Sequence, residues 1–240
     1  MKILIATIMR NCAPILNRYW SQLNTILDTF PQHEWYLSIY ENDSNDGTEL
    51  IGQNTNFDFS RFVDYSIVSE KLGTIQYGSV INDERVTNLA NARNKALYAK
   101  DMIQNVDLVL WIENDISYDM KLIDGLLNNS LDHVDIISGV NLDPNRGYAT
   151  YDTWATRPTI NDEQGTIYHD WIENPIREFY STFNGICLYN AEPIKKGIAF
   201  GGYNSRLQKH DCDTVVICEN FRAAGYDKIY INQSLHCFHL

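Results

Sequence analysis

Residues 106–115 read VDLVLWIEND, an apolar run that ends abruptly in two carboxylates flanking an amide. Because the positions before Glu113 are apolar in succession rather than in alternation, the run predicts a fully buried strand of the kind that parallel sheets contain. Ligands of open α/β sheets bind in the crevice outside the carboxyl ends of the strands. Glu113, Asn114 and Asp115 are therefore expected to project into a binding crevice.

Carboxylate oxygens in such a crevice suit Mg²⁺ or Mn²⁺, which is commonly held by one or two carboxylates together with substrate phosphates. The triplet therefore predicts a metal–diphosphate site in which Glu113 and Asp115 bind the metal. The alternative is a strand end followed by solvated turn residues, since Asn and Asp favour turns.

The chain around this run alternates predicted strands and helices. Strands are expected at residues 3–8, 35–40, 62–68, 106–112 and 134–140, and helices at 14–29, from 48, 86–101 and 120–127. This order predicts an α/β fold with a mostly parallel sheet and helices on both faces. The polar stretch 69–84 is expected to be a long loop, and such loops are often functional.

The composition changes after residue 142. Residues 143–178 are rich in Tyr, Trp, Asn, Asp and Pro, which predicts irregular structure with short antiparallel pieces. A final helix is expected at 211–224 before Gly225, then a short strand at 229–231 and an aromatic, His-bearing tail at 235–240. At 240 residues, one domain is expected.

Composition excludes several classes of function. The net charge of −12 argues against nucleic-acid binding and against docking to an anionic membrane. No segment reaches the length of a membrane span, and residues 1–10 predict a first strand rather than a signal peptide. Five cysteines without a CxxC spacing argue against structural zinc and favour a reducing compartment, so a cytoplasmic protein is expected.

Further motifs follow the same order along the chain. Residues 41–48 (ENDSNDGT) end the second apolar run, 89–97 read LANARNKAL, and YDTW, FNGI and HDCD occupy 151–154, 183–186 and 210–213. This arrangement resembles the fungal capsule-associated α-1,3-mannosyltransferase family of retaining GT-A glycosyltransferases. The resemblance runs from about Ile3 to the C-terminus.

The most specific pieces of the resemblance are residues 40–44 with 46–48, and 92–94. The chain departs from the family in three ways. Glu113 stands where the family's metal triplet begins with Asp, Asp211-Cys212-Asp213 replaces Glu-Cys-Glu, and no membrane anchor like that of the fungal members is found.

The resemblance implies a Rossmann-like GT-A fold with a small irregular acceptor-side subdomain. Residues 1–142 would then bind the nucleotide sugar, and 143–240 would form the acceptor-side half and the tail. The implied reaction is metal-dependent transfer of a sugar, with mannose as a candidate, from a GDP- or UDP-sugar to a glycan hydroxyl with retention. The cofactor would be Mn²⁺ or Mg²⁺.

Several polar residues, Asn114 among them, are expected at the nucleotide. Thr7, Arg10, Glu41, Asn42 and Ser44 follow the first two strands, where a GT-A fold holds base and ribose, and acidic side chains suit ribose hydroxyls. The alternative is a turn that caps the helix near residue 48. We expect Glu41 and Asn42 to face the ligand.

A second group lies nearer the phosphates. Arg93, beside Asn94, would reach a donor phosphate or an acidic partner, and the alternative is a solvated helix face. His239 in the tail would complete the metal shell, with His236 as the other candidate. The alternative is a terminal cluster in which these histidines pack with Phe238 and Leu240.

The acceptor side is expected to be aromatic and acidic. Tyr151, Asp152, Trp154 and Trp171 would suit sugar faces and hydroxyls, or they would form subdomain core. Asn184 and Gly185 would let the backbone approach a ligand, or make a turn. The catalytic candidates are Asp211 and Asp213, of which one would face the reacting sugar and the other would cap the last helix or complement its dipole.

Two other functions remain open at this point. A sugar-1-phosphate nucleotidyltransferase would need a glycine-rich basic loop near the N-terminus, and residues 7–12 (TIMRNC) do not form one. A non-catalytic glycan-binding module on a transferase scaffold is the second alternative, since a fold does not dictate a function.

Overall fold

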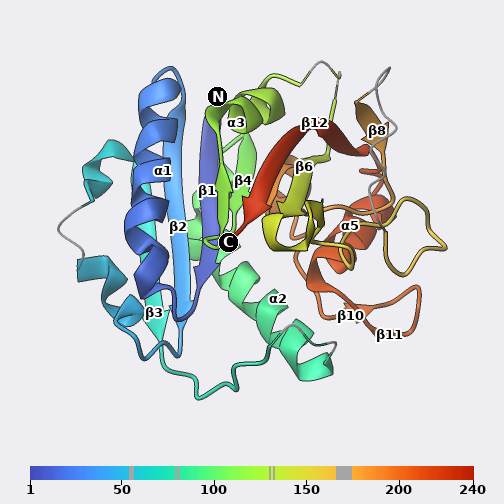
Figure 1. Cartoon of the computed structure of the whole chain (residues 1–240), viewed down its shortest axis with the longest axis horizontal. Helices are drawn as coiled ribbons and strands as arrows, with labels where there is room; N and C mark the ends of the chain where they lie inside the picture. Colours follow the sequence, from blue (N-terminus) through green and yellow to red (C-terminus); the bar gives the residue numbers. More distant parts are fainter. Residues whose placement is uncertain (54–56, 79, 81, 130, 132, 166–174) are drawn as a thin grey trace.

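A mixed sheet with helices on both faces forms the centre of the protein in this computed structural model (Figure 1). The structure describes residues 1–53, 57–78, 80, 82–129, 131, 133–165 and 175–240. The elements, with η for short 3-10 helices, are β1 (Lys2–Met9), η1 (Ala13–Ile15), α1 (Leu16–Thr29), β2 (Glu34–Asn42), η2 (Thr48–Gln53), η3 (Phe59–Arg61), β3 (Asp64–Glu70), α2 (Asp83–Leu97), η4 (Ala99–Asn105), β4 (Leu108–Ile112), β5 (Ile116–Tyr118), α3 (Met120–Leu127), β6 (Ile136–Asp143), η5 (Pro144–Arg146), β7 (Ala149–Thr150), β8 (Ile176–Glu178), β9 (Ile186–Asn190), α4 (Ala191–Lys195), β10 (Tyr203–Asn204), β11 (Lys209–His210), α5 (Asp213–Ala223) and β12 (Ile229–His239).

The strand order of the sheet is β3-β2-β1-β4-β9-β6-β12-β5, with β7 beside β6 and β8 beside β12. The strands β3, β2, β1 and β4 are mutually parallel, as the alternation of strands and helices predicts. The described residues contain no helix that is both long enough and apolar enough to cross a bilayer.

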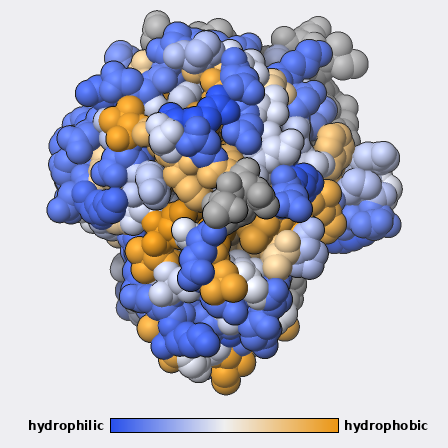
Figure 2. Space-filling view, turned by 90° about the vertical axis from the view of Figure 1, so that its left-hand side faces the viewer, coloured by the Kyte–Doolittle hydropathy of each residue, from blue (hydrophilic) through white to orange (hydrophobic). Residues whose placement is uncertain are grey.

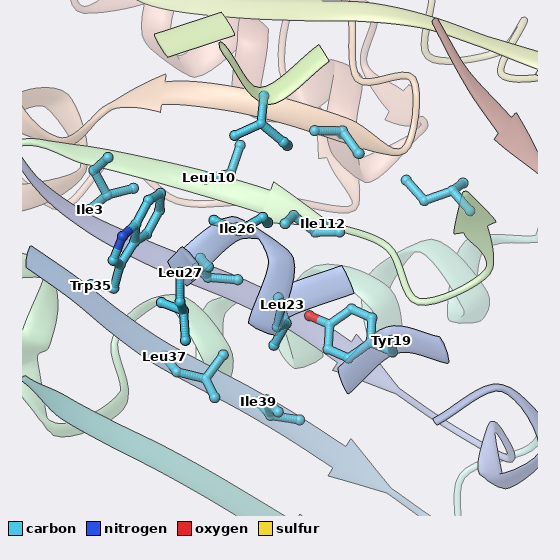
Figure 3. Close-up of a cluster of buried hydrophobic side chains, with 14 of the residues drawn as sticks. Ile3, Tyr19, Leu23, Ile26, Leu27, Trp35, Leu37, Ile39, Leu110 and Ile112 are labelled. Atoms are coloured by element: carbon cyan, nitrogen blue, oxygen red, sulfur yellow. The ribbon is translucent and has the colours of Figure 1, made fainter. Parts of the chain in front are cut away.

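Continuous apolar strands arise here because both faces of the sheet are covered. Ile3 and Ile5 of β1 pack with α1 and α3 in one core cluster, whereas Leu4 and Ala6 pack with α2 and α5 in the other. Figure 3 shows the first cluster, in which side chains of α1 point onto β1, β2 and β4. Each buried Leu or Ile side chain contributes about 1.5–3 kcal/mol, so this packing holds the strand ends in place.

Two features of the sheet differ from the predictions. Strand β9 lies between β4 and β6 and is antiparallel to both, a pairing that no local sequence pattern predicts. The predicted last strand and tail form one strand, β12, with a register shift between Ile231 and His236. Gly139 permits this irregularity, because a Cβ at that position would lie 2.6 Å from the carbonyl oxygen of Leu235.

Two predicted helices are also shorter than expected. The segment from residue 48 forms only the 3-10 helix η2. Helix α2 ends at Leu97, since Lys100 and Asp101 adopt positive φ angles of 51° and 54° that interrupt the helical hydrogen bonds.

The C-terminal strand returns to the carboxyl end of β4. Strand β12 pairs antiparallel with β5, so that His239 lies opposite Ile116, and the backbone N–H of Leu240 donates to the carbonyl oxygen of Asp115 at 3.0 Å. Figure 1 accordingly places the C-terminus close to the middle of the molecule.

The side of the molecule on which α1 and β3 lie in Figure 1 is mainly hydrophilic. Figure 2 shows that some hydrophobic side chains gather within this face.

Candidate active site

Two adjoining cavities lie where β1, β2 and β4 end. The first has a volume of about 310 Å³ and is lined by those strand ends, by residues 72–77 and by α2. The second has a volume of about 240 Å³ and is lined by residues 151–154, the start of α5 and His239, among others. Glu113, Asp115, Arg85 and Leu89 line both cavities. The predicted crevice at the end of β4 is therefore present as a double cavity.

Three of the residues predicted for the nucleotide line the first cavity, namely Arg10, Asn42 and Asn114. The placement of Glu41 is different from the prediction, because its side chain is fully buried beside the cavity wall. Its carboxylate accepts hydrogen bonds from the backbone N–H of Ser44 at 2.8 Å and from the Ser69 hydroxyl. Glu41 therefore organises the loop after β2 and lines neither cavity.

Three other residues that were predicted to bind the nucleotide also make their hydrogen bonds within the protein. The buried Thr7 hydroxyl donates to the carbonyl oxygen of Ile8, and the Ser44 hydroxyl accepts from the backbone N–H of Asn11. Asn94 exchanges two hydrogen bonds with the backbone of Phe200, at 2.9 and 3.0 Å. None of Thr7, Ser44 and Asn94 lines either cavity.

Asp43 belongs to the motif at residues 41–48 but was not predicted as a site residue. It holds the loop that forms one wall of the first cavity. Its carboxylate accepts from the backbone N–H groups of Leu72, Gly73 and Thr74 at 2.7–2.9 Å, and from the Thr74 hydroxyl. Burial opposes ionisation of Asp43, yet the hydrogen bonds from Thr74, Asn42 and the loop amides outweigh it and lower its pKa well below the usual value. The loop is thus fixed by an ionised side chain.

Arg93 is buried between two acids of the predicted site. Its Nε donates to Asp213 at 2.6 Å and its Nη1 donates to Glu113 at 2.5 Å. The guanidinium also lies 4.9 Å from the ring centre of Trp111 and 4.6 Å from that of Phe183. Burial disfavours the charged form of Arg93, but the two carboxylates raise its pKa above the usual value. Of the two functional interpretations, the structure places Arg93 with an acidic partner.

Asp115 and His239 face each other at the junction of the cavities. The Asp115 side chain is 52% exposed, and its Oδ2 lies 3.8 Å from Nδ1 of His239. Tyr151 stacks on the His239 ring at 3.6 Å between centroids. His236 lines neither cavity and pairs with Val140 within the sheet. The register of β12 thus selects His239 as the tail histidine beside the triplet.

The donor atoms at this junction fit a divalent cation. Nδ1 of His239 makes no hydrogen bond within the described chain, and 3.8 Å is compatible with two ligands that each bind one ion at about 2.1 Å. Among the described residues, no three His, Cys, Asp or Glu side chains are grouped so as to hold a metal unaided. An ion at Asp115 and His239 would take its other ligands from phosphate and water, as Mg²⁺ commonly does.

The second cavity contains most of the residues predicted for the acceptor. Tyr151, Asp152, Trp154 and Gly185 line it. Asn184 is buried behind it and donates its backbone N–H to Asp152 at 3.0 Å. Trp171 lies outside the described residues. Positive φ angles of 56° at Asn184 and 73° at Gly185 form the turn that brings this backbone against the cavity.

The carboxyl group of Asp152 in the second cavity has a raised pKa. Burial raises its pKa to about 6, although the Asn184 N–H and Arg93 favour its ionised form, and the nearby Asp213 and Glu113 raise the pKa further. Burial likewise raises the pKa of Glu113. Perturbed carboxylates that share a cavity are typical of functional sites.

The two catalytic candidates lie in different surroundings. Asp213 lines the second cavity, held by Arg93. Asp211 lines neither cavity and forms a buried, two-point ion pair with Arg157 at 2.6 and 2.9 Å, to which Asn204 adds a hydrogen bond at 2.9 Å. Of the two candidates, Asp213 is thus the one that lines a cavity, because both oxygens of Asp211 accept hydrogen bonds from Arg157 within the protein.

The sequence predicted that Arg93 and Asn94 of α2 lie near the phosphates, but further residues of this helix were not expected at the cavities. Arg85, Asn88, Leu89 and Asn91 all line the first cavity. A signal was available, because Arg85, Leu89 and Arg93 are spaced four residues apart and so fall on one face of a helix.

Comparisons with known proteins agree with this architecture. Residues 2–220 match the family described as Cryptococcal mannosyltransferase 1. No curated protein matches the chain.

Several solved structures share the fold. S. aureus TarS 1–349 is 14% identical with a TM-score of 0.54, over 100% of this chain and 60% of that one. The mannosyltransferase PcManGT from Pyrobaculum calidifontis, in complex with GDP-Man and Mn²⁺, is 15% identical with a TM-score of 0.55, over 99% and 56%. Mannosyl-3-phosphoglycerate synthase from Rubrobacter xylanophilus is 14% identical with a TM-score of 0.56, over 100% and 66%. The chain spans less than two thirds of each, and the predicted GT-A fold is confirmed.

Proposed function

The chain belongs to the cryptococcal mannosyltransferase 1 family, and from this premise we propose that it is a metal-dependent glycosyltransferase that moves mannose from GDP-mannose to a glycan hydroxyl with retention. The observation that carries the proposal is the double cavity joined at Asp115, Glu113 and Arg85. The nucleoside diphosphate occupies the first cavity, and the sugar and the acceptor meet in the second. Similarity to a mannosyltransferase solved with GDP-Man and Mn²⁺ supports the choice of donor.

The metal site lies at the junction. Asp115 and His239 would hold Mn²⁺ or Mg²⁺ together with phosphate and water, whereas Glu113, also predicted as a ligand, has its Oε1 engaged by Arg93 and Trp111. The bound ion supplies charge neutralisation for the leaving diphosphate. Arg93 bridges Glu113 and Asp213 and offsets their mutual repulsion where both line the second cavity.

The acceptor-side residues then act on the sugar. Positive charge that grows on the anomeric carbon is balanced by the Asp213 carboxylate or by a phosphate oxygen. Asp152 accepts a hydrogen bond from the attacking hydroxyl, with Trp154 and Tyr151 beside the sugar faces. This division assigns the acceptor to residues 143–240 and the nucleotide to residues 1–142, with Asp213 at the sugar and His239 at the metal as the residues of the second half that also act on the donor.

The function is tested by measuring release of nucleoside diphosphate from GDP-mannose and UDP-sugars with Mn²⁺ and with EDTA. We expect Mn²⁺-dependent release of GDP, stimulated by a mannose-containing glycan, and a donor-dependent rise in Tm. A nucleotidyltransferase would instead release pyrophosphate from a nucleoside triphosphate and a sugar 1-phosphate. A glycan-binding module would bind glycans without releasing either product.

Adjacent residues at the end of β2 offer a matched pair of variants. Asn42→Ala is expected to weaken binding of free GDP several-fold, since loss of a neutral hydrogen bond costs about 1 kcal/mol, and to lower Tm less than Glu41→Ala does, because its part-buried amide also donates to Asp43 and Thr74. Glu41→Ala should instead lower the stability by about 1–3 kcal/mol, because the buried backbone N–H of Ser44 loses its acceptor, as does the Ser69 hydroxyl. Calorimetric titration with GDP and thermal unfolding distinguish the two effects. If Glu41→Ala lost GDP affinity without losing stability, the placement of its side chain would be contradicted.

Asp152→Asn is expected to reduce transfer to a glycan by about a hundredfold while donor affinity stays near that of the wild type. Transfer by the wild type should rise as the pH increases through about 6, where Asp152 ionises. Because the folded-state pKa is raised, the wild type loses stability as pH rises from about 3.8 to 6, so the gain in Tm from Asp152→Asn should be larger at pH 8 than at pH 4.

The measurements are paired titrations with GDP-mannose and with acceptor, together with pH–rate profiles. Trp154→Ala serves as the companion variant that removes an aromatic wall and no charge. A loss of donor affinity in Asp152→Asn as large as that in Asp115→Ala would show that this region shapes the donor pocket, and the proposed division would be wrong.

A further inference from the structure

The cationic side chains that line the two cavities differ in how strongly the protein engages them. Arg10 donates to the Thr74 carbonyl oxygen and hydroxyl at 2.7 and 3.1 Å. Lys95 pairs with Glu70, and Arg93 pairs with Glu113 and Asp213. The guanidinium of Arg85 has no hydrogen bond or ion pair with any residue that the structure describes.

Arg85 is also the one cation among the described residues that lines both cavities. It lies in the first turn of α2, where its backbone N–H donates to the Asn82 side chain at 3.0 Å. Leu89 and Arg93 follow at intervals of four residues, so the three side chains share the helix face that closes the junction. Arg85 is therefore positioned by the helix and remains available to a ligand.

The junction contains more acidic than basic side chains, so an anionic ligand there needs an available cation. Glu113, Asp115, Asp152 and Asp213 line the second cavity, whereas Arg85 and Arg93 are its cations, and Arg93 is already paired with two of the acids. A diphosphate that enters this surplus of negative charge needs cations for compensation. A guanidinium suits phosphate because its planar fork donates two parallel hydrogen bonds.

We infer that Arg85 binds the diphosphate of the nucleotide sugar at the junction, an assignment that rests on the proposed function. In the transfer step, the bond between the anomeric carbon and the phosphate oxygen breaks, and its electron pair stays on the phosphate. The acceptor oxygen forms the new bond to the anomeric carbon, and its proton passes to a basic oxygen in the site. Arg85 N–H groups contact the leaving phosphate as its charge increases, so the contact strengthens during the reaction.

The test compares Arg85→Ala and Arg85→Lys with Arg61→Ala, a control that removes the same charge from a side chain paired with Asp28 and outside both cavities. Binding of GDP, UDP, guanosine and uridine is measured by calorimetry in the presence of MnCl₂. We expect Arg85→Ala to lose at least about tenfold in affinity for the diphosphate that the wild type binds, with nucleoside binding unchanged. Arg85→Lys should fall between, and Arg61→Ala should match the wild type.

Two results would overturn the assignment of Arg85 alone: wild-type affinity for the diphosphate in Arg85→Ala, or an equal loss for diphosphate and nucleoside. A wild-type protein that binds neither GDP nor UDP would instead overturn the proposed function, and the Arg85 assignment with it. In turnover, Arg85→Ala should lower kcat as well as affinity, because the contact is strongest when the leaving phosphate carries most charge.

Discussion

Asp115→Ala is expected to reduce Mn²⁺-dependent turnover on the order of a hundredfold or more, since a bound metal supplies several kcal/mol of charge stabilisation to the transition state. The fold should remain intact, because the Asp115 side chain is 52% exposed and contributes little to either core cluster. Release of GDP from GDP-mannose across a Mn²⁺ titration measures the first effect, and thermal unfolding measures the second.

The matched control is Asp124→Ala, which removes the same charge from an exposed position on α3 outside both cavities. This variant should titrate with Mn²⁺ as the wild type does. Full metal-dependent activity in Asp115→Ala would exclude Asp115 as a metal ligand. An equal loss of Mn²⁺-dependent turnover in Asp124→Ala would show that the change in net charge alone causes the effect.

Arg157→Ala is expected to produce the largest loss of stability, about 3–5 kcal/mol, because it leaves the buried Asp211 carboxylate without its partner. Although burial opposes ionisation, Arg157 lowers the pKa of Asp211 below 3.8 in the folded state. The stabilisation is therefore fully present above the unfolded-state pKa and is lost as pH falls through the folded-state value. The gap between variant and wild type should accordingly be widest near neutral pH and narrow in acid.

Urea unfolding at several pH values measures this effect, and Lys209→Ala, which breaks an exposed pair with Glu163, should stay near the wild type. Unfolding combined with turnover assays distinguishes the roles of the two acids on either side of Cys212. Asp211→Asn should lower stability yet keep turnover per folded molecule, whereas Asp213→Asn should lower turnover. Equal loss of turnover in both variants at a temperature where both are folded would restore Asp211 as a catalytic candidate.

Local sequence carried the information for the strands, the covering helices and the edge at which the site lies. The consecutive apolar residues before Glu113 indicate a strand that is buried on both faces. Parallel strands joined by helices bring their carboxyl ends to one edge of the sheet. The positions of Asn42, Asn114 and Asp115 at the cavity follow from that rule alone. Helix α3 likewise occupies the predicted residues, because its amphipathic pattern and the Asp119 cap are local.

The roles of individual polar side chains depended on partners far away in the chain. Successive strand residues point to opposite faces, so Glu41 could turn inward while Asn42 lines the cavity, and sequence does not say which. Asp211 and Asp213 are two residues apart, yet Arg157 draws one into the interior and Arg93 holds the other at the cavity. The pairings of β9 and β12 are equally long-range, and they bring His239 to Asp115. Only the tertiary structure determines which partner each side chain meets. The free energy of a buried charge depends on which opposite charge that structure brings within hydrogen-bond distance.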